Sequence, residues 1–214
     1  MKHLIFRLIS LMTGLVFYAV GIVMTIKANV GYAPWDVFHV GLMNITSLSL
    51  GIISIIVGLM IVIIVTILKE KFGLGTVLNM VFIGIFIDII FPRFPAAPNQ
   101  FTGYIMLIAG LFIISFGSYF YIRSAFGVGP RDNLMVVLAR RTKLPAGLCR
   151  FTVELLVTVI GWFLGGMAGI GTIISAVGIG FCIQLVFKIF KFDVTAVKHE
   201  TLRETFTVTG KKYQ

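Results

Sequence analysis

Six long apolar stretches dominate the chain, and short polar or glycine-rich segments separate them. The stretches lie at about 8–26, 50–68, 72–91, 101–122, 151–168 and 170–189. Because an α-helix needs roughly 20 residues to cross the hydrocarbon core of a bilayer, each stretch is predicted to span a membrane once. The segments after the first and the fourth stretch are too long for turns and too polar to span. Each is predicted to hold one short additional helix.

The composition agrees with a protein that lies in lipid. Of the 214 residues, 58% are hydrophobic and 12% are charged, and the mean hydropathy is +1.05. No water-soluble domain of this size carries such an apolar surplus on its surface. We therefore predict an all-α polytopic membrane protein with six transmembrane helices. The first stretch is longer than an ordinary signal-peptide core and lacks a small-residue cleavage site, so we expect it to be retained.

The second half of the chain repeats the first at an offset of 96 residues. When residues 14–91 are placed on residues 110–187 without a gap, 24 of 78 positions are identical. Shared apolar composition explains matched isoleucines and leucines, but not a series of matched glycines, prolines and acids. These pairs include Gly14 with Gly110, Gly21 with Gly117, Gly31 with Gly127, Pro34 with Pro130, Asp36 with Asp132, Gly51 with Gly147 and Gly84 with Gly180. We predict a first repeat at 1–93, a second at 94–190 and a polar cytoplasmic tail at 191–214.

Each predicted repeat has three crossings, so the second copy must enter the membrane upside down relative to the first. Such inverted repeats are common in secondary transporters. In this layout all of the 18 lysines and arginines except Lys27 and Arg93 fall on the side of the N-terminus. The positive-inside rule then places both termini in the cytoplasm of a bacterial plasma (inner) membrane. It also explains the net charge of +10 without nucleic acid as a partner.

The most informative repeated motif is a cation followed by glycine, proline and aspartate. Proline suits the first position of a helix, and an acid two residues later complements the positive helix end. The motif residues are Lys27, Gly31, Pro34 and Asp36 in the first repeat and Arg123, Gly127, Pro130 and Asp132 in the second. Two interpretations stay open. Either the acids cap short interfacial helices and pair with the nearby cations, or the short helices dip back into the protein and meet a solute, ion or proton.

A second repeated motif stands at the start of the third crossing of each repeat. It reads Gly-x-Gly-Thr, at Gly73, Gly75 and Thr76 and again at Gly169, Gly171 and Thr172. Glycine permits a tight turn and threonine can cap a helix, so we predict a helix-start motif with close helix packing. A phosphate-binding loop is not expected, because the longer glycine pattern with its lysine is absent.

Two acids lie inside predicted crossings and are candidates for a binding site. Ionisable groups within membrane segments are costly and are by default functional. Asp88, however, lies about one turn from its helix end and can reach the interface near Arg93. Glu154 follows Arg150 by one helical turn, so an intrahelical ion pair is available. The repeat places Gly58 opposite Glu154 and Gln184 opposite Asp88, so a site that uses these acids is asymmetric.

Other reactive residues do not form a recognisable catalytic or metal-binding pattern. The three histidines are far apart, no nucleophile or metalloprotease motif occurs, and Cys149 and Cys182 suit packing roles. We therefore predict no enzyme activity, no metal and no cofactor. A basic cluster in the second short segment is interpreted as a topology anchor at anionic lipid headgroups. Its members are Arg131, Arg140, Arg141 and Lys143.

The glycine-proline-aspartate and Gly-x-Gly-Thr motifs and the six-helix layout resemble the YczE family, which is grouped with the YyaS and YitT membrane proteins of bacteria. The resemblance covers about residues 5–190 and is strongest at Pro34, Asp36, Gly75 and their repeat partners. It implies an integral membrane protein without an established substrate, and a role in regulating antibiotic production or competence has been suggested for one branch. Larger YitT-type proteins carry a soluble C-terminal domain, which this length is not expected to include.

Two functions remain open on the sequence. The first is a transporter or channel-like protein for a small solute, with a central site flanked by the two proline-aspartate helices. The second is a non-transporting membrane partner, such as a regulatory or substrate-capturing subunit. Membrane lipid, a small solute, and a protein partner or a second copy of the chain are the partners that these two functions imply.

Overall fold

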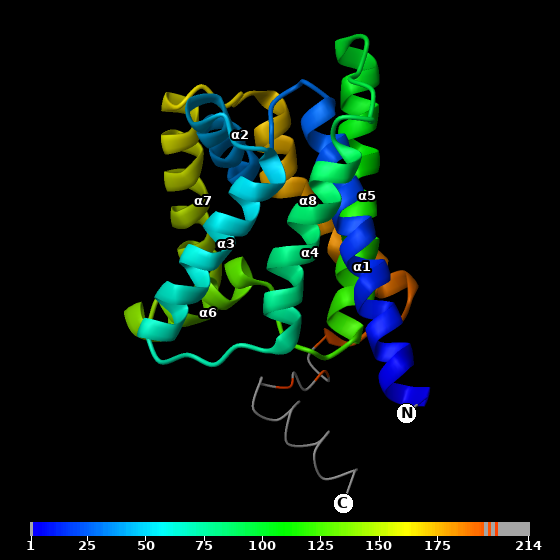
Figure 1. The fold of residues 1–214 in the computed structure, drawn as a ribbon, viewed down its shortest axis with the longest axis vertical. Helices are drawn as coiled ribbons and strands as arrows, with labels where there is room; N and C mark the ends of the chain where they lie inside the picture. Colours follow the sequence, from blue (N-terminus) through cyan, green and yellow to red (C-terminus); the bar gives the residue numbers. More distant parts are fainter. Residues whose placement is uncertain (1, 195–196, 198–199, 201–214) are drawn as a thin grey trace, which may run out of the picture.

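Eight α-helices make up the part of the chain that the computed structural model describes, residues 2–194, 197 and 200 (Figure 1). The helices are α1 (Lys2–Lys27), α2 (Pro34–Thr46), α3 (Leu50–Ile67), α4 (Leu74–Ile90), α5 (Gln100–Arg123), α6 (Pro130–Thr142), α7 (Ala146–Phe163) and α8 (Ile170–Ile189). The predicted all-α class is therefore confirmed. Most of the predicted tail, namely 195–196, 198–199 and 201–214, lies outside the described residues.

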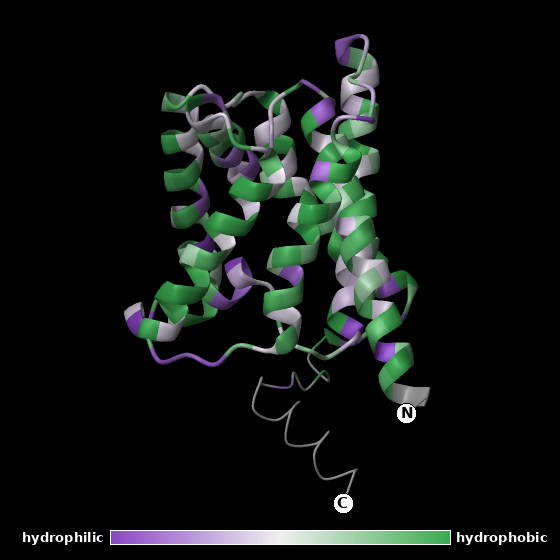
Figure 2. Ribbon diagram, viewed as in Figure 1, coloured by the Kyte–Doolittle hydropathy of each residue, from purple (hydrophilic) through white to green (hydrophobic). Residues whose placement is uncertain are grey.

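Five helices have the length and apolar composition to cross a membrane by themselves. They are α1 from Leu4 onward, α3, α5, α7 and α8, whereas α4 is equally apolar but has only 17 residues. Their outward surfaces carry many exposed large hydrophobic side chains, which is typical of contact with lipid. Figure 2 shows predominantly hydrophobic ribbons, with hydrophilic stretches in the two short helices and in the loop between α3 and α4.

The two predicted short helices are present as α2 and α6, each 13 residues long. Proline occupies the first position of both, and the preceding residue is extended. Both helices end where the next residue turns into the left-handed region, at Ser47 with φ 56° and Lys143 with φ 58°. These local signals explain why two brief helices interrupt the membrane crossings.

Helix boundaries and special backbone angles recur at the same offset of 96 residues. At this offset, the C-terminal end of α1 matches the C-terminal end of α5. Both ends of α2 match those of α6, and both ends of α3 match those of α7. Residues with positive φ match as well, at Asn29 (53°) with Ala125 (61°) and Gly31 (110°) with Gly127 (122°). The two halves therefore share their local structure in addition to their sequence.

The fifth crossing lies about five residues earlier than the sequence suggested, at 146–163 instead of 151–168. Pro145 provides the turn before this helix, and Gly165, with φ 90°, lies in the turn after it. Arg150 lies just outside the predicted apolar stretch. It is accommodated within α7 because its guanidinium Nε donates to Glu154 Oε1 at 2.8 Å.

Helices α1 and α5 cross closely through glycines from both halves. A Cβ added to Gly14 would lie 2.8 Å from the carbonyl oxygen of Gly117, and one added to Gly110 would lie 3.0 Å from that of Gly21. These two contacts are the same contact with the roles of the halves exchanged, because Gly14 matches Gly110 and Gly21 matches Gly117 at the repeat offset. Only glycine permits such close approach of two helix backbones.

The third and fourth helices of each half pack differently. A Cβ on Gly51 of α3 would meet the carbonyl oxygen of Gly84 in α4 at 2.0 Å. Their counterparts Gly147 in α7 and Gly180 in α8 have no described atom within 4 Å of that position. Helix α7 instead packs on α2, where a Cβ on Gly41 would lie 2.6 Å from an oxygen of α7. The α3–α4 contact is therefore closed, and the equivalent α7–α8 contact is open.

Candidate functional site

A cavity of about 290 Å³ lies at the centre of the helices. All eight helices contribute residues to its wall. In Figure 1, the short helix α2 lies toward the upper end of the bundle and the short helix α6 lies toward the lower end. The polar and aromatic lining residues are Tyr18, Trp35, His39, Ser54, Asn79, Ser118, Tyr121, Arg131, Asp132, Arg150 and Glu154. The size is near the lower limit of typical small-molecule sites, which favours a small solute.

Several lining residues are counterparts at the repeat offset. Trp35 corresponds to Arg131, Ser54 to Arg150 and Ile83 to Ile179, and all six line the cavity. The cavity thus lies between the two halves. Its fixed charges are nevertheless one-sided, because Arg131, Asp132, Arg150 and Glu154 all come from the second half.

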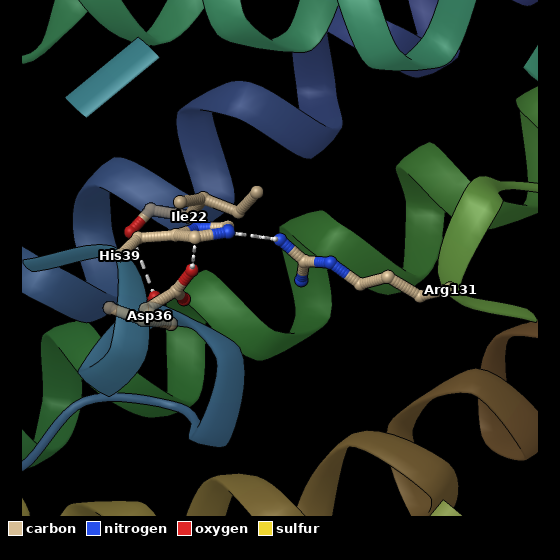
Figure 3. A network of polar contacts seen from close by, with 5 residues as sticks. Ile22, Asp36, His39 and Arg131 are labelled. Carbon is tan, nitrogen blue, oxygen red and sulfur yellow. Dashed lines mark hydrogen bonds and ion pairs between the residues drawn. The ribbon is translucent and has the colours of Figure 1, made fainter. Parts of the chain in front are cut away.

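The starts of the two short helices meet at the cavity. The guanidinium of Arg131 lies over the Trp35 ring, 4.9 Å from its centroid. Its Nη2 also lies 3.5 Å from each ring nitrogen of His39. Figure 3 shows Arg131 reaching across to His39, which stands between this guanidinium and the carboxylate of Asp36. The His39 Nδ1 and Asp36 Oδ1 atoms are 3.7 Å apart, and both residues are buried.

The carboxylate of Asp132 belongs to a second polar group at the cavity wall, beside Gly129. Asp132 is exposed to the cavity, and it makes no hydrogen bond or ion pair with a described residue. Its Oδ2 lies 3.5 Å from the place that a Cβ on Gly129 would occupy, and Asn79 Oδ1 and the Tyr121 hydroxyl lie 3.6 Å from it. The Tyr121 hydroxyl is buried and has no hydrogen-bond partner among the described residues. Three oxygens therefore surround one small space.

The other two charged residues of the cavity wall form an ion pair with each other. Arg150 and Glu154 form the intrahelical ion pair that the sequence suggested, at 2.8 Å. Both side chains reach the cavity wall from α7. Because each charge is neutralised by the other, this pair lowers the cost of placing two charged residues in a membrane helix.

Reduced hydration shifts the pKa of two groups in the short helices, the buried His39 and the cavity-facing Asp132. Both helices lie outside the membrane-spanning segments. Loss of hydration raises the pKa of the Asp132 carboxyl, and the positive charges of Arg150 and Arg131 partly oppose this rise. Burial lowers the pKa of His39, although the nearby carboxylate of Asp36 acts in the other direction. His39 is therefore uncharged near neutral pH, and Asp132 accepts a proton at higher pH than an aspartate in bulk water.

The two cations of the proline-aspartate motif lie away from the cavity. Lys27 Nζ stands over the ring of Phe91, 4.1 Å from its centroid. Arg123 donates to the Tyr119 hydroxyl at 3.1 Å and faces the ring of Phe6. The ion pairs of these cations with Asp36 and Asp132, considered on sequence grounds, are not formed.

The glycines of the two repeated motifs interlock with each other across the halves. A Cβ on Gly31 would lie 2.8 Å from the nitrogen of Gly169, and one on Gly127 would lie 2.8 Å from the Cα of Gly73. The Gly75 nitrogen donates to the Phe126 carbonyl at 2.7 Å. These glycines thus join the turn before each short helix to a helix start in the other half.

The remaining helix-start residues complete this junction. The Gly171 nitrogen donates to the Val30 carbonyl at 2.8 Å, the reciprocal of the Gly75 contact. Thr172 Oγ1 accepts from the Gly169 nitrogen at 3.0 Å, and Thr76 Oγ1 donates to the Val128 carbonyl at 2.6 Å. Pro34 and Pro130 open the short helices, and only Pro130 reaches the cavity wall.

Asp88 is not a cavity residue. Its Oδ1 accepts from the Gly51 nitrogen at 2.7 Å and its Oδ2 accepts from the Ser49 hydroxyl. The carboxylate therefore satisfies the start of α3, where main-chain N–H groups lack helical partners. Arg93, its suggested partner, donates instead to the Ile89 carbonyl.

Sequence reasoning missed several of the residues that form the cavity. Arg131 was interpreted as a lipid anchor, and Trp35, His39, Asn79 and Tyr121 were not singled out. One signal was present in the sequence: Trp35 and Arg131 occupy the variable middle position of the repeated Pro-x-Asp motif. The repeat keeps the proline and the aspartate but changes the residue between them, so the two short helices present different side chains at this position.

Comparisons with known proteins identify the relatives of this chain. Residues 5–188 match a family of unknown function, DUF6198. The uncharacterized membrane protein YczE of Bacillus subtilis is 33% identical over 186 residues, which cover 86% of each chain. An uncharacterized protein of Haemophilus influenzae is 30% identical over 179 residues, 84% of this chain and 82% of its own.

A further relative is more distant, and no solved structure matches the chain. The uncharacterized protein YyaS of Bacillus subtilis is 26% identical over 166 residues, 76% of this chain and 83% of its own. The resemblance to YczE and YyaS that the motifs suggested is confirmed, and so is the membrane location. The chain belongs to the DUF6198 family and is a YczE-type membrane protein.

Proposed function

We propose that this protein is a transporter of a small solute, built from two inverted three-helix repeats around the central cavity. In this proposal the shorter helix α4 completes six crossings, and both termini face the cytoplasm of a bacterial inner membrane. The observation that carries the proposal is the charged cavity, to which all eight helices contribute. Charged side chains are expensive inside a membrane protein, and they generally mark a path for a solute or an ion.

Reciprocal contacts support the inverted arrangement. Two halves related by a two-fold axis make each contact twice, with the roles of the halves exchanged. The glycine contacts between α1 and α5 follow this rule, and so do the junctions of Gly75 with Phe126 and of Gly171 with Val30. Trp35 and Arg131 occupy corresponding positions and touch each other, as residues beside such an axis do.

The difference between the α3–α4 contact and the equivalent α7–α8 contact supports alternating access. One half has a closed contact at Gly51 and Gly84, whereas Gly147 and Gly180 of the other half are exposed. In an inverted repeat, exchanging the two arrangements produces a second conformation that opens the cavity toward the other side. The open glycines of α7 and α8 are then the packing surface of that second state.

Solute flux into proteoliposomes that contain only this protein tests the proposal. The panel comprises inorganic ions, amino acids, amines and organic acids. Uptake of one class is expected, and Asp132→Asn is expected to reduce it, whereas Arg140→Gln on the outer part of the same helix is expected to leave it unchanged. If no class moves while the protein is folded, the proposal is wrong and the alternative of a non-transporting membrane partner gains support.

A further inference from the structure

Two of the charged side chains on the cavity wall make no ion pair with another described side chain. Arg150 is paired with Glu154, and Asp36 does not line the cavity. Arg131 makes no ion pair within the described residues, and neither does Asp132. The cavity therefore offers one positive and one negative charge to whatever occupies it.

The positive charge is held in a fixed position. The Arg131 guanidinium lies over the Trp35 ring, 4.9 Å from its centroid. Figure 3 shows the same guanidinium beside the ring of His39. Stacking on an aromatic face fixes a guanidinium while it leaves its N–H donors at the edge available. These donors match the two oxygens of a carboxylate, which is the partner that arginine binds most specifically.

The negative charge stands in a group of oxygens that suits an ammonium. Asp132 Oδ2, Asn79 Oδ1 and the Tyr121 hydroxyl surround the space beside Gly129 at 3.5 to 3.6 Å from one point. A protonated amine has three N–H donors and needs acceptors for all of them when water is removed. The buried Tyr121 hydroxyl, which lacks a partner among the described residues, supplies an acceptor that the fold itself does not use.

We propose that the central cavity binds a small zwitterion of the amino-acid type, with its carboxylate on Arg131 and its ammonium on Asp132, Asn79 and Tyr121. This inference rests on the proposed function for the role of the cavity, and it adds the class of substrate. A solute with both charges leaves neither Arg131 nor Asp132 without a partner. A simple anion or cation would leave one of them uncompensated, at a considerable cost in a site of low polarity. The cavity volume of about 290 Å³ agrees with such a solute.

Tryptophan fluorescence measures binding without any need for transport. The chain has two tryptophans, Trp35 in the cavity wall and the exposed Trp162 on α7. In a Trp162→Phe background, the signal therefore reports on the ring that contacts Arg131. The probes are glycine, alanine, β-alanine and γ-aminobutyrate, with alaninamide, which lacks the carboxylate, and N-acetylalanine, which lacks the ammonium.

We expect at least one zwitterion to bind about tenfold or more tightly than alaninamide and N-acetylalanine, because each derivative lacks one charged contact. Arg131→Gln is expected to remove the preference over alaninamide, and Asp132→Asn the preference over N-acetylalanine. Arg140→Gln and Asp88→Asn serve as controls, since both residues lie outside the cavity, and they are expected to keep both preferences.

The outcomes separate this inference from the transport proposal. Equal binding of a zwitterion and of either derivative overturns the zwitterion site, and so does a lack of response to every probe. Flux of a different class of solute would then still support transport. Conversely, selective zwitterion binding without flux overturns the transport proposal and leaves the zwitterion site in place.

Discussion

The same substitution at two corresponding positions is expected to have opposite effects on stability. Gly51 and Gly147 are related by the repeat offset, and both lie in the second position of their helices. An added methyl group on Gly51 would lie 2.0 Å from the carbonyl oxygen of Gly84 and 2.5 Å from the Asp88 carboxyl carbon. An added methyl group on Gly147 meets no described atom within 4 Å.

The structure sets the size of each effect. Overpacking of a close contact costs about 1–3 kcal/mol, and the displaced Asp88 carboxylate weakens a charged hydrogen bond to the Gly51 nitrogen that contributes about 1.5–3 kcal/mol. The better helix propensity of alanine offsets about 1 kcal/mol. Gly51→Ala is therefore expected to lower the free energy of unfolding by about 1.5–5 kcal/mol. Gly147→Ala is expected to raise it by up to about 1 kcal/mol.

Unfolding of the purified variants in detergent, followed by circular dichroism, measures both changes. Flux in proteoliposomes then adds a functional comparison. Because the proposed second conformation closes Gly147 against Gly180, Gly147→Ala is expected to slow transport although the protein is stable. Equal destabilisation by the two substitutions would refute the packing difference on which this reasoning depends. A stable Gly147→Ala variant with unchanged flux would refute the proposed closure.

Two further predictions concern single carboxylates. Asp88→Ala is expected to destabilise the protein by about 1–3 kcal/mol, because it removes the acceptor for the Gly51 nitrogen, whereas Asp88→Asn keeps an acceptor and is expected to cost less; detergent unfolding measures the difference, and equal effects would contradict the capping role. Zwitterion binding is expected to be complete above the pKa of Asp132 and to fall as the pH is lowered through it. Because this pKa is raised, the fall begins at higher pH than for an aspartate in bulk water. Asp132→Asn, measured by the same fluorescence titration, is expected to remove this pH dependence, and an unchanged profile would contradict the prediction.

The sequence predicted the helical layout well because the strongest signals were local. Apolar runs, a proline at the start of each short helix and the glycine matches are all properties of short segments. The fifth crossing was misplaced because it was located by its apolar run alone, which begins after Arg150. The pairing of Arg150 with Glu154 was recognised, but the pairing was not used to extend the helix backwards to Pro145.

The cavity was harder to predict because it depends on which side chains converge in space. Asp132 was identified from the repeated proline-aspartate motif, and Glu154 was identified because acids in membrane segments are conspicuous. The stacking of Arg131 on Trp35 joins residues 96 positions apart, and no local pattern shows it. Asp88 looked like a site residue for the same reason as Glu154, whereas its actual role becomes visible only when α4 packs against the start of α3.

The central claim is that the protein alternates between two conformations around the cavity. In one, α3 packs closely on α4 while α7 and α8 are apart; in the other, α7 packs closely on α8 while α3 and α4 are apart. Distances between spin labels on two corresponding pairs test it directly: Ile52 with Ile85 on α3 and α4, and Leu148 with Phe181 on α7 and α8, after the two native cysteines are replaced. All four positions are exposed. The account predicts that both pairs sample the same short and long distances, and that a bound solute shifts their proportions in opposite directions. A single unchanging distance for each pair, with and without solute, would contradict it.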